Sequence, residues 1–191
     1  GQVMTTTLLP NQRKYKIQRI DGLKSTMVTP PKDILDRIKS EGKLVRAARG
    51  LNSPLGDFWR GFDWPAVGKI TGIYGSQRIL NGKPRQPHFG IDIAGPRGSP
   101  VYAPASGLIT FVEDLYFSGW TIIMAHGLGV NSSFLHLEKV KVKKNMFVKR
   151  GAVIGTIGST GRSTGPHLDW RIDWQGRRID AGLLVGPMPP Q

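Results

Sequence analysis

The chain has 191 residues, enough for one domain of ordinary size or for a domain with a smaller neighbour. Hydrophobic residues make up 39% and charged residues 21%, so the composition is globular and excludes a largely disordered chain. The 25 glycines and 14 prolines favour a β-rich fold with many turns. Because there is no cysteine, disulfides and thiolate metal ligands are excluded, and any metal must be held by His, Asp or Glu.

The net charge of +14 indicates attraction to an anionic partner, for which nucleic acid, a membrane surface and the bacterial cell wall are all candidates. No run of 18 apolar residues exists, so no membrane-spanning helix is predicted. The opening Gly1-Gln2-Val3-Met4 does not have the pattern of a signal peptide. We expect the sequence to be a piece of a longer protein whose targeting signal lies elsewhere. The sequence predicts no oligomeric state.

Residues 1–64 predict a small region of strand and helix. Alternating side chains over 14–18 indicate a strand, and Asp21-Gly22 indicates a turn. Apolar residues at helical spacing predict a helix over 32–50, with Gly50 as its end. Five bulky residues then follow, which we expect to seat this region on the rest of the molecule: Leu55, Phe58, Trp59, Phe62 and Trp64.

From about residue 65 the chain predicts short strands separated by glycine and proline. The strand candidates are 101–103, 107–112, 120–124, 130–135 and 152–157. Short strands at regular spacing are typical of an all-β sandwich or barrel-like core. We therefore predict a mainly β domain over residues 65–191, preceded by the region 1–64.

All four histidines lie in this β-rich part. His88 and Asp92 are four residues apart, and in an extended strand they would be separated by roughly 13 Å. That distance is too long for two ligands of one metal ion, so a shared metal requires the chain to bend between them. Gly90 is the residue that would permit the bend. Taken alone, the pair is weak evidence.

A second cluster, His167-Leu168-Asp169, places two polar side chains on one face of a predicted strand, about 6.6 Å apart. This spacing suits one metal ligand beside one proton-transfer group. His136, between Leu135 and Leu137, and His126 are ambiguous, because a histidine in an apolar run is often only a hydrogen-bonded core residue.

Three segments together make the pattern specific. His88-Phe89-Gly90-Ile91-Asp92 resembles the HxxxD motif of lysostaphin (LytM)-type metallopeptidases, and Phe134-Leu135-His136-Leu137 resembles their central Y-x-H-L segment. Residues 158–169, Gly-Ser-Thr-Gly-Arg-Ser-Thr-Gly-Pro-His-Leu-Asp, resemble their last motif, which is long and specific. The glycine spacing over 148–155 also matches. The similarity covers roughly residues 65–185, and residues 1–64 resemble the region that precedes the peptidase core in larger cell-wall enzymes.

The resemblance implies a lysostaphin-type core, a two-sheet β-sandwich with a duplicated hybrid motif. It implies a zinc-dependent endopeptidase that cuts peptide cross-links of bacterial peptidoglycan in the periplasm or cell envelope. One Zn²⁺ per chain would be held by His88, Asp92 and Asp169. A metal-activated water would then react with the help of His136 and His167, for proton transfer and oxyanion stabilisation. His126 would have no direct role. Arg78, Asn81 and Arg85 precede His88 on a loop expected to line the groove.

Asp169 departs from the family pattern, which usually has histidine there as the third ligand. Aspartate is a legitimate zinc ligand, and its oxygens reach as far as histidine Nδ1 but not as far as Nε2. It completes the site if the usual histidine binds through Nδ1. The second carboxylate also makes the site more anionic, which should make bound water less acidic and favour harder ions such as Mn²⁺ slightly. Zinc remains the predicted ion.

Two alternatives come from other functional classes. The domain could be a metal-free relative that binds peptidoglycan or activates a separate cell-wall amidase. Such degenerate members usually lose several site residues together, whereas only one is exchanged here. A basic nucleic-acid-binding β-domain has support from charge alone, because the strands show no row of exposed aromatic residues for base stacking.

Overall fold

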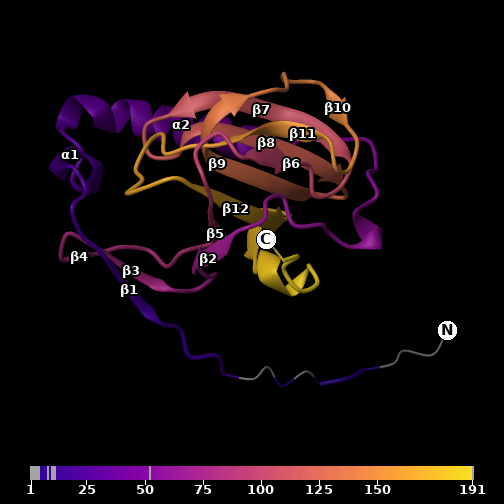
Figure 1. Ribbon diagram of the computed structural model, residues 1–191, viewed down its shortest axis with the longest axis horizontal. Coiled ribbons are helices and arrows are strands. Elements are labelled where there is room, and N and C mark those ends of the chain that lie inside the picture. Colours follow the sequence, from indigo (N-terminus) through magenta and orange to yellow (C-terminus); the bar gives the residue numbers. More distant parts are fainter. Residues whose placement is uncertain (1–4, 8, 10–11, 52, 191) are drawn as a thin grey trace.

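The computed structural model describes residues 5–7, 9, 12–51 and 53–190 of the chain (Figure 1). Residues 1–4, 8, 10, 11 and 52 of the predicted N-terminal region lie outside the described residues. Most of the regular structure is β, in two sheets of very different size. The prediction of a mainly β fold is confirmed.

The large sheet has ten strands, and its main path runs β10-β7-β8-β9-β12-β5-β2. Strand β11 pairs with β6 and β9, and β13 pairs with β12. The bounds are β2 (Lys69–Gly72), β5 (Ile91–Ala94), β6 (Pro100–Tyr102), β7 (Gly107–Leu115), β8 (Gly119–Gly127), β9 (Val130–Val140), β10 (Phe147–Val148), β11 (Val153–Ile157), β12 (His167–Trp174) and β13 (Arg177–Ile179). All five strands predicted beyond residue 100 are present, and several are longer than predicted.

The small sheet joins the N-terminal region to the β-rich part of the chain. Strand β1 (Ile17–Ile20) pairs in parallel with β3 (Gln77–Leu80), and β3 pairs with β4 (Lys83–Pro84). The predicted strand over 14–18 is therefore displaced toward the C-terminus. Its regular hydrogen bonding begins at Ile17, where β3 becomes available as a partner.

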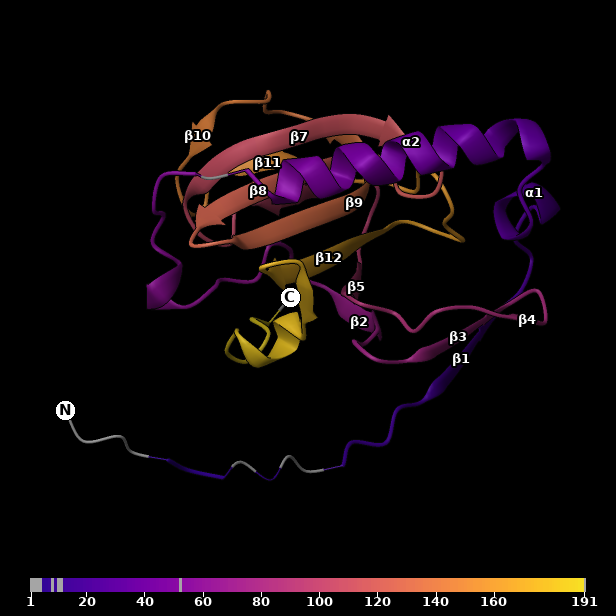
Figure 2. The ribbon, with the colours of Figure 1, turned by 180° about the vertical axis from the view of Figure 1, so that it is seen from behind.

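Helix α2 (Lys32–Arg49) matches the predicted helix and ends at Gly50. It lies against β7 and β8, as the view from behind shows (Figure 2). Ala48 packs there in a small buried cluster with Phe111, Leu115 and Ile123. The sequence analysis did not predict the one-turn helix α1 (Ser25–Val28) or the 3₁₀ turns η1 (Phe58–Arg60) and η2 (Ala181–Leu183).

The main core is formed by side chains of the large sheet and receives part of the aromatic segment. Phe62 is buried in it, and Phe58 and Trp64 pack against it. The Trp64 and Trp170 rings meet edge to face, with centroids 6.1 Å apart. Leu55 and Trp59, by contrast, are more exposed, although the Leu55 side chain lies against Gly127 of β8. The proposed boundary after residue 64 stays a prediction. Among the described residues, no helix is long and apolar enough to cross a membrane.

Candidate metal and catalytic site

The acidic residues of the site lie in one row across neighbouring strands. Gly72 on β2 is the register partner of Asp92 on β5, and Asp92 is the partner of Asp169 on β12. Asp169 in turn faces Leu135 on β9. Directly opposite residues of antiparallel strands project to the same face, so pairing alone brings Asp92 and Asp169 together although 77 positions separate them.

His88 comes from the loop that precedes β5. The chain bends at Gly90, as predicted, and His88 Nε2 lies 3.1 Å from Asp92 Oδ1. The requirement for glycine is steric rather than conformational. A Cβ atom at Gly90 would overlap the Asp169 carboxylate and lie 2.8 Å from the Trp170 carbonyl oxygen. Glycine therefore allows the His88 loop to lie directly on β12.

Three buried polar atoms at this point have no hydrogen-bond partner among the described residues: His88 Nδ1, His88 Nε2 and Asp92 Oδ1. His88 is 2% exposed and Asp92 5%, so water does not satisfy them from outside. Unsatisfied buried polar groups are costly and call for an explanation, of which a bound ion is one. The atoms that lack partners are also good ligands for a divalent metal.

His88, Asp92 and Asp169 each offer a ligand atom, and these atoms lie within 4.8 Å of one another. Ligand atoms that share a tetrahedral zinc at its usual bond lengths are about 3.4 Å apart. The longest separation would therefore have to close by no more than about 1.5 Å, within reach of side-chain rotation. These residues fit a metal ion with two oxygen donors and one nitrogen donor.

Each carboxylate is also paired with an arginine. Arg171 Nη2 donates to Asp169 Oδ2 at 2.6 Å, and Arg78 Nη2 donates to Asp92 Oδ2. Burial opposes ionisation of Asp169, but the charge of Arg171 outweighs it and holds the pKa of this carboxyl below its usual range. Burial likewise acts to raise the pKa of Asp92, yet the nearby His88 and Arg78 leave that pKa below its ordinary value.

His136 sits where β9 changes partners. Leu135 pairs with β12, whereas Leu137 pairs with β11. Between them His136 has a φ of 64°, a left-handed conformation that is unusual for a residue with a side chain. Its Nδ1 donates to the Thr160 carbonyl oxygen at 2.8 Å, which leaves the lone pair on Nε2. Burial, reinforced by the charge of His167, lowers the pKa of His136 to about 4, so its ring is neutral at neutral pH.

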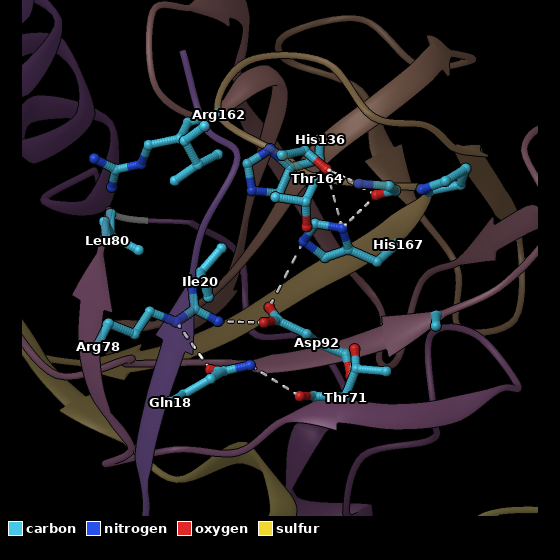
Figure 3. A pocket seen from close by; sticks show the side chains of 15 residues that line it. Gln18, Ile20, Thr71, Arg78, Leu80, Asp92, His136, Arg162, Thr164 and His167 are labelled. Carbon is cyan, nitrogen blue, oxygen red and sulfur yellow. Dashed lines mark hydrogen bonds and ion pairs between the residues drawn. The ribbon is translucent and has the colours of Figure 1, made fainter. Parts of the chain in front are cut away.

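His167 begins β12, two positions before Asp169 on the same strand. Its Nδ1 donates to the Gly165 carbonyl oxygen at 2.8 Å, so its Nε2 also carries the lone pair. That Nε2 lies 3.9 Å from Asp92 Oδ1, and the centroids of the His136 and His167 rings are 4.8 Å apart. Figure 3 shows the two rings side by side above Asp92.

These histidines and Asp92 line a pocket of about 270 Å³, and part of its wall comes from the N-terminal region. The Gln18 amide donates to the Thr71 carbonyl oxygen at 3.1 Å, and its oxygen accepts from Arg78 Nε at 3.3 Å (Figure 3). Ile20 and Leu23 add apolar surface to the same wall. Strand β1 and the residues that follow it thus form part of the pocket wall.

The structure brings together all five residues predicted for the site: His88, Asp92, His136, His167 and Asp169. His126 lies apart from them, fully buried, with Nδ1 2.9 Å from the Ser106 carbonyl oxygen and Nε2 2.8 Å from Ser132 Oγ. Sequence analysis gave Arg78 no firm role and overlooked Arg171. Arg171 could have been found, because residues two apart on a strand share a face.

Comparison with known proteins agrees with this geometry. The model described as Peptidase family M23 matches residues 86–181. The chain is 40% identical over 102 residues to the peptidoglycan DD-endopeptidase ShyA of Vibrio cholerae, covering 53% of this chain and 24% of that protein. It is 39% identical over 102 residues to the DD-carboxypeptidase/endopeptidase Mpg of Neisseria meningitidis, with the same coverage. The chain thus spans about a quarter of the length of these curated relatives.

Solved structures extend the likeness to the fold. A putative peptidase M23 from Pseudomonas aeruginosa superposes with a TM-score of 0.70 at 34% identity, covering 82% of this chain and 63% of that one. The catalytic domain of lysostaphin from Staphylococcus simulans gives a TM-score of 0.55 at 31% identity, covering 61% and 90%. The resemblance inferred from the three motifs is therefore confirmed, and the chain belongs to peptidase family M23.

Proposed function

We propose that this chain is a zinc-dependent endopeptidase that hydrolyses peptide cross-links of bacterial peptidoglycan. One observation carries the proposal: buried His88 and Asp92 present three polar atoms without partners among the described residues, directly beside two histidines with free Nε2 lone pairs. A metal-ligand set next to two proton acceptors is what water-dependent peptide hydrolysis needs.

Zinc suits the donor set, in which one imidazole and two carboxylates would hold the ion and leave a coordination position open. His88, Asp92 and Asp169 are the proposed ligands. Bound there, zinc would supply a Lewis acid and lower the pKa of a water molecule. A zinc containing peptidase from Vibrio cholerae, whose structure matches with a TM-score of 0.61 at 34% identity, supports this choice of ion.

His136 and His167 would move the protons. Each ring is fixed by an Nδ1 hydrogen bond to a backbone carbonyl oxygen, so each Nε2 is held ready to accept a proton. One Nε2 takes the proton of the attacking water and later passes it to the leaving amine. The other ring stabilises negative charge on the carbonyl oxygen when its Nε2 is protonated and donates to that oxygen. No glutamate among the described residues lines the pocket to act as an alternative base.

The proposed substrate is a peptidoglycan peptide. The relatives ShyA and ShyB are peptidoglycan DD-endopeptidases, and Mpg is a DD-carboxypeptidase/endopeptidase. The stem peptides of peptidoglycan carry carboxylates, which a chain of net charge +14 attracts. Arg162 and Arg78 line the pocket and supply positive charge beside the histidines. This substrate implies work in the periplasm or another part of the cell envelope.

The test is digestion of purified peptidoglycan by the zinc-loaded chain, with products separated by liquid chromatography and identified by mass. We expect cross-linked muropeptide dimers to be converted to monomers. His136→Asn and His167→Asn should each reduce the rate at least 100-fold while metal content, measured by elemental analysis, stays one per chain.

Two results would count against the proposal. Binding of peptidoglycan without any conversion of dimers would instead support the inactive, amidase-activating alternative. Full turnover by either histidine variant would remove that histidine from the mechanism.

A further inference from the structure

We propose that Arg171 is a positioning residue of the metal site, which holds the Asp169 carboxylate and offsets its charge so that this aspartate can serve as the third ligand. The inference rests on the proposed function, because it assigns a role toward the metal. It concerns two residues that are two positions apart on β12 and on the same face.

The Arg171 guanidinium makes three hydrogen-bond contacts with the Asp169 carboxylate. Arg171 Nη2 and Nε lie 2.6 and 3.2 Å from Asp169 Oδ2, and Nε lies 3.0 Å from Oδ1. Oδ2 thus receives two of the three contacts. Oδ1 receives one contact, at 3.0 Å, keeps a second lone pair, and lies beside Gly90 in the loop that carries His88. The arginine therefore leaves one lone pair of Oδ1 available to an ion.

Asp92 is held in the same way, which supports a common design. Its Oδ2 accepts from Arg78 Nη2, while its Oδ1 has no hydrogen-bond partner among the described residues and faces His88. Each carboxylate therefore has Oδ2 held by the Nη2 of an arginine, whereas Oδ1 has no hydrogen-bond partner among the described residues in Asp92 and accepts from Arg171 Nε in Asp169. Arg78 is itself held by the Gln18 amide oxygen.

The pairing of Arg171 with Asp169 compensates a buried negative charge. Asp169 is fully buried, and a buried carboxylate without a partner costs several kcal/mol. Two carboxylates around a divalent ion also make a more anionic site than one carboxylate with two histidines. Arg171, with 24% of its side chain exposed, brings a compensating positive charge to Asp169. If histidine stood at position 169, the same guanidinium would face a neutral ring and the metal, and it would repel the ion.

The experiment measures zinc affinity by competition with a chromogenic chelator, together with the visible absorption spectrum of the Co²⁺-loaded chain. Arg171→Ala should weaken zinc binding about 10- to 100-fold, as is usual for a residue that orients a ligand. It should also alter the Co²⁺ spectrum, because Asp169 is free to reorient. Arg171→Lys keeps the charge but loses the planar guanidinium, so its zinc affinity should lie between those of the wild type and Arg171→Ala.

A double-mutant cycle tests the link to Asp169 itself. Asp169→His alone should bind zinc more weakly than Asp169→His combined with Arg171→Ala, because only the single variant leaves a guanidinium beside the ion. Arg49→Ala is the matched control. Arg49 is similarly buried, with 18% of its side chain exposed, and it pairs with Asp173 on the same strand at 3.2 Å. Zinc affinity and the Co²⁺ spectrum should be unchanged in this variant.

Each outcome has a separate meaning. Failure of the wild-type chain to bind zinc at all would overturn the proposed metal centre, and this inference with it. Zinc binding by the wild type with equal or tighter binding by Arg171→Ala would overturn the inference alone. If Arg171→Ala does not fold, Arg171→Lys and the double variant decide, because neither leaves a buried carboxylate without a cation.

Discussion

At the scale of single residues, the site depends on one glycine that allows two chain segments to touch. We expect Gly90→Ala to lower the free energy of unfolding by about 1–3 kcal/mol, because its methyl group would push the His88 loop away from β12. It should also weaken metal binding, since His88 and Asp169 would be forced apart. Chemical denaturation and zinc titration measure the two effects.

Gly165→Ala is the control for that change. Gly165 also lies beside the site, but a Cβ atom there would meet nothing within 4 Å. We expect its free energy of unfolding and its zinc affinity to match those of the wild type. Equal behaviour of the two alanine variants would show that close approach at Gly90 is unimportant.

His126 gives a residue-scale prediction about pH. Burial lowers the pKa of His126 to about 4, against an ordinary value near 6.5. As the pH falls below 6.5, the unfolded chain takes up a proton that the folded chain refuses, so stability is lost down to pH 4. The loss from this residue should reach about 3 kcal/mol at pH 4. Urea denaturation from pH 7 to pH 4 measures the total for all groups.

Comparison with His126→Gln isolates that contribution. The variant has no titrating ring, so its free energy of unfolding should fall by about 3 kcal/mol less than that of the wild type over the same range. The pKa of His136 is also lowered to about 4 by burial, but His136 is common to both proteins. Parallel pH profiles would contradict the prediction.

At the scale of elements, the N-terminal segment is fastened to the pocket by Asn81. The Asn81 amide donates to the Leu23 carbonyl oxygen at 2.7 Å, and its oxygen accepts from the Leu23 amide at 3.2 Å. Asn81 has a φ of 46°, which glycine adopts readily, so Asn81→Gly removes the two hydrogen bonds without strain. We expect trypsin to cleave this variant severalfold faster after Arg19 and Lys24 than it cleaves the wild type.

Tryptic cleavage at a site elsewhere in the chain serves as the control. Cleavage after Lys143 and Lys144, which precede β10, should proceed at the same rate in both proteins and reports any general loss of stability. If Asn81→Gly leaves cleavage at Arg19 and Lys24 unchanged, the segment is held in place by its other contacts, such as the pairing of β1 with β3.

The elements also show what sequence patterns can and cannot predict. Helix α2 and the strands beyond residue 100 were predictable, because apolar spacing and glycine punctuation are local signals. The parallel pairing of β1 with β3 was not, because it joins segments some 60 residues apart. The change of partner at His136 was equally hidden. Strands β11 and β12 both pair with β9 along the same edge, and no local sequence pattern predicts this arrangement.

The site, too, has features that the sequence predicts and features that it does not. The five residues proposed as metal ligands and proton-transfer groups could be selected from the sequence, because they stand in long motifs with family-specific spacing. The two arginines were not assigned, since their roles depend on which oxygen of which carboxylate they reach. Gly90 was expected to permit a bend, whereas its actual constraint is contact with Asp169 and Trp170 across the sheet. Sequence indicates the chemistry of such a site more readily than the contacts that hold it.

At the scale of the whole molecule, the proposed ion would join the loop that carries His88 to two strands that are already paired in the large sheet. His88 comes from a loop, Asp92 from β5 and Asp169 from β12. Binding to the folded state alone raises stability by mass action, by about 2.7 kcal/mol when free zinc is 100 times Kd. For a chain of this size we expect the melting temperature to rise by about 5–10 °C. Differential scanning calorimetry with buffered zinc measures the rise, and a chelator should reverse it.

The His88→Ala variant distinguishes zinc bound at the proposed site from zinc bound elsewhere on the protein. The imidazole Nε2 lies 3.1 Å from Asp92 Oδ1, and Asp92 keeps its pairing with Arg78 through Oδ2 when the ring is removed. The metal-free variant should therefore melt within a few degrees of the metal-free wild type, at the cost of a small cavity. Zinc should raise the melting temperature of this variant only slightly, because one of the three proposed ligands is absent. An equal zinc-dependent rise in both proteins would locate the binding elsewhere, for instance at the exposed carboxylates, and would separate the stabilisation from the pocket that holds His136 and His167.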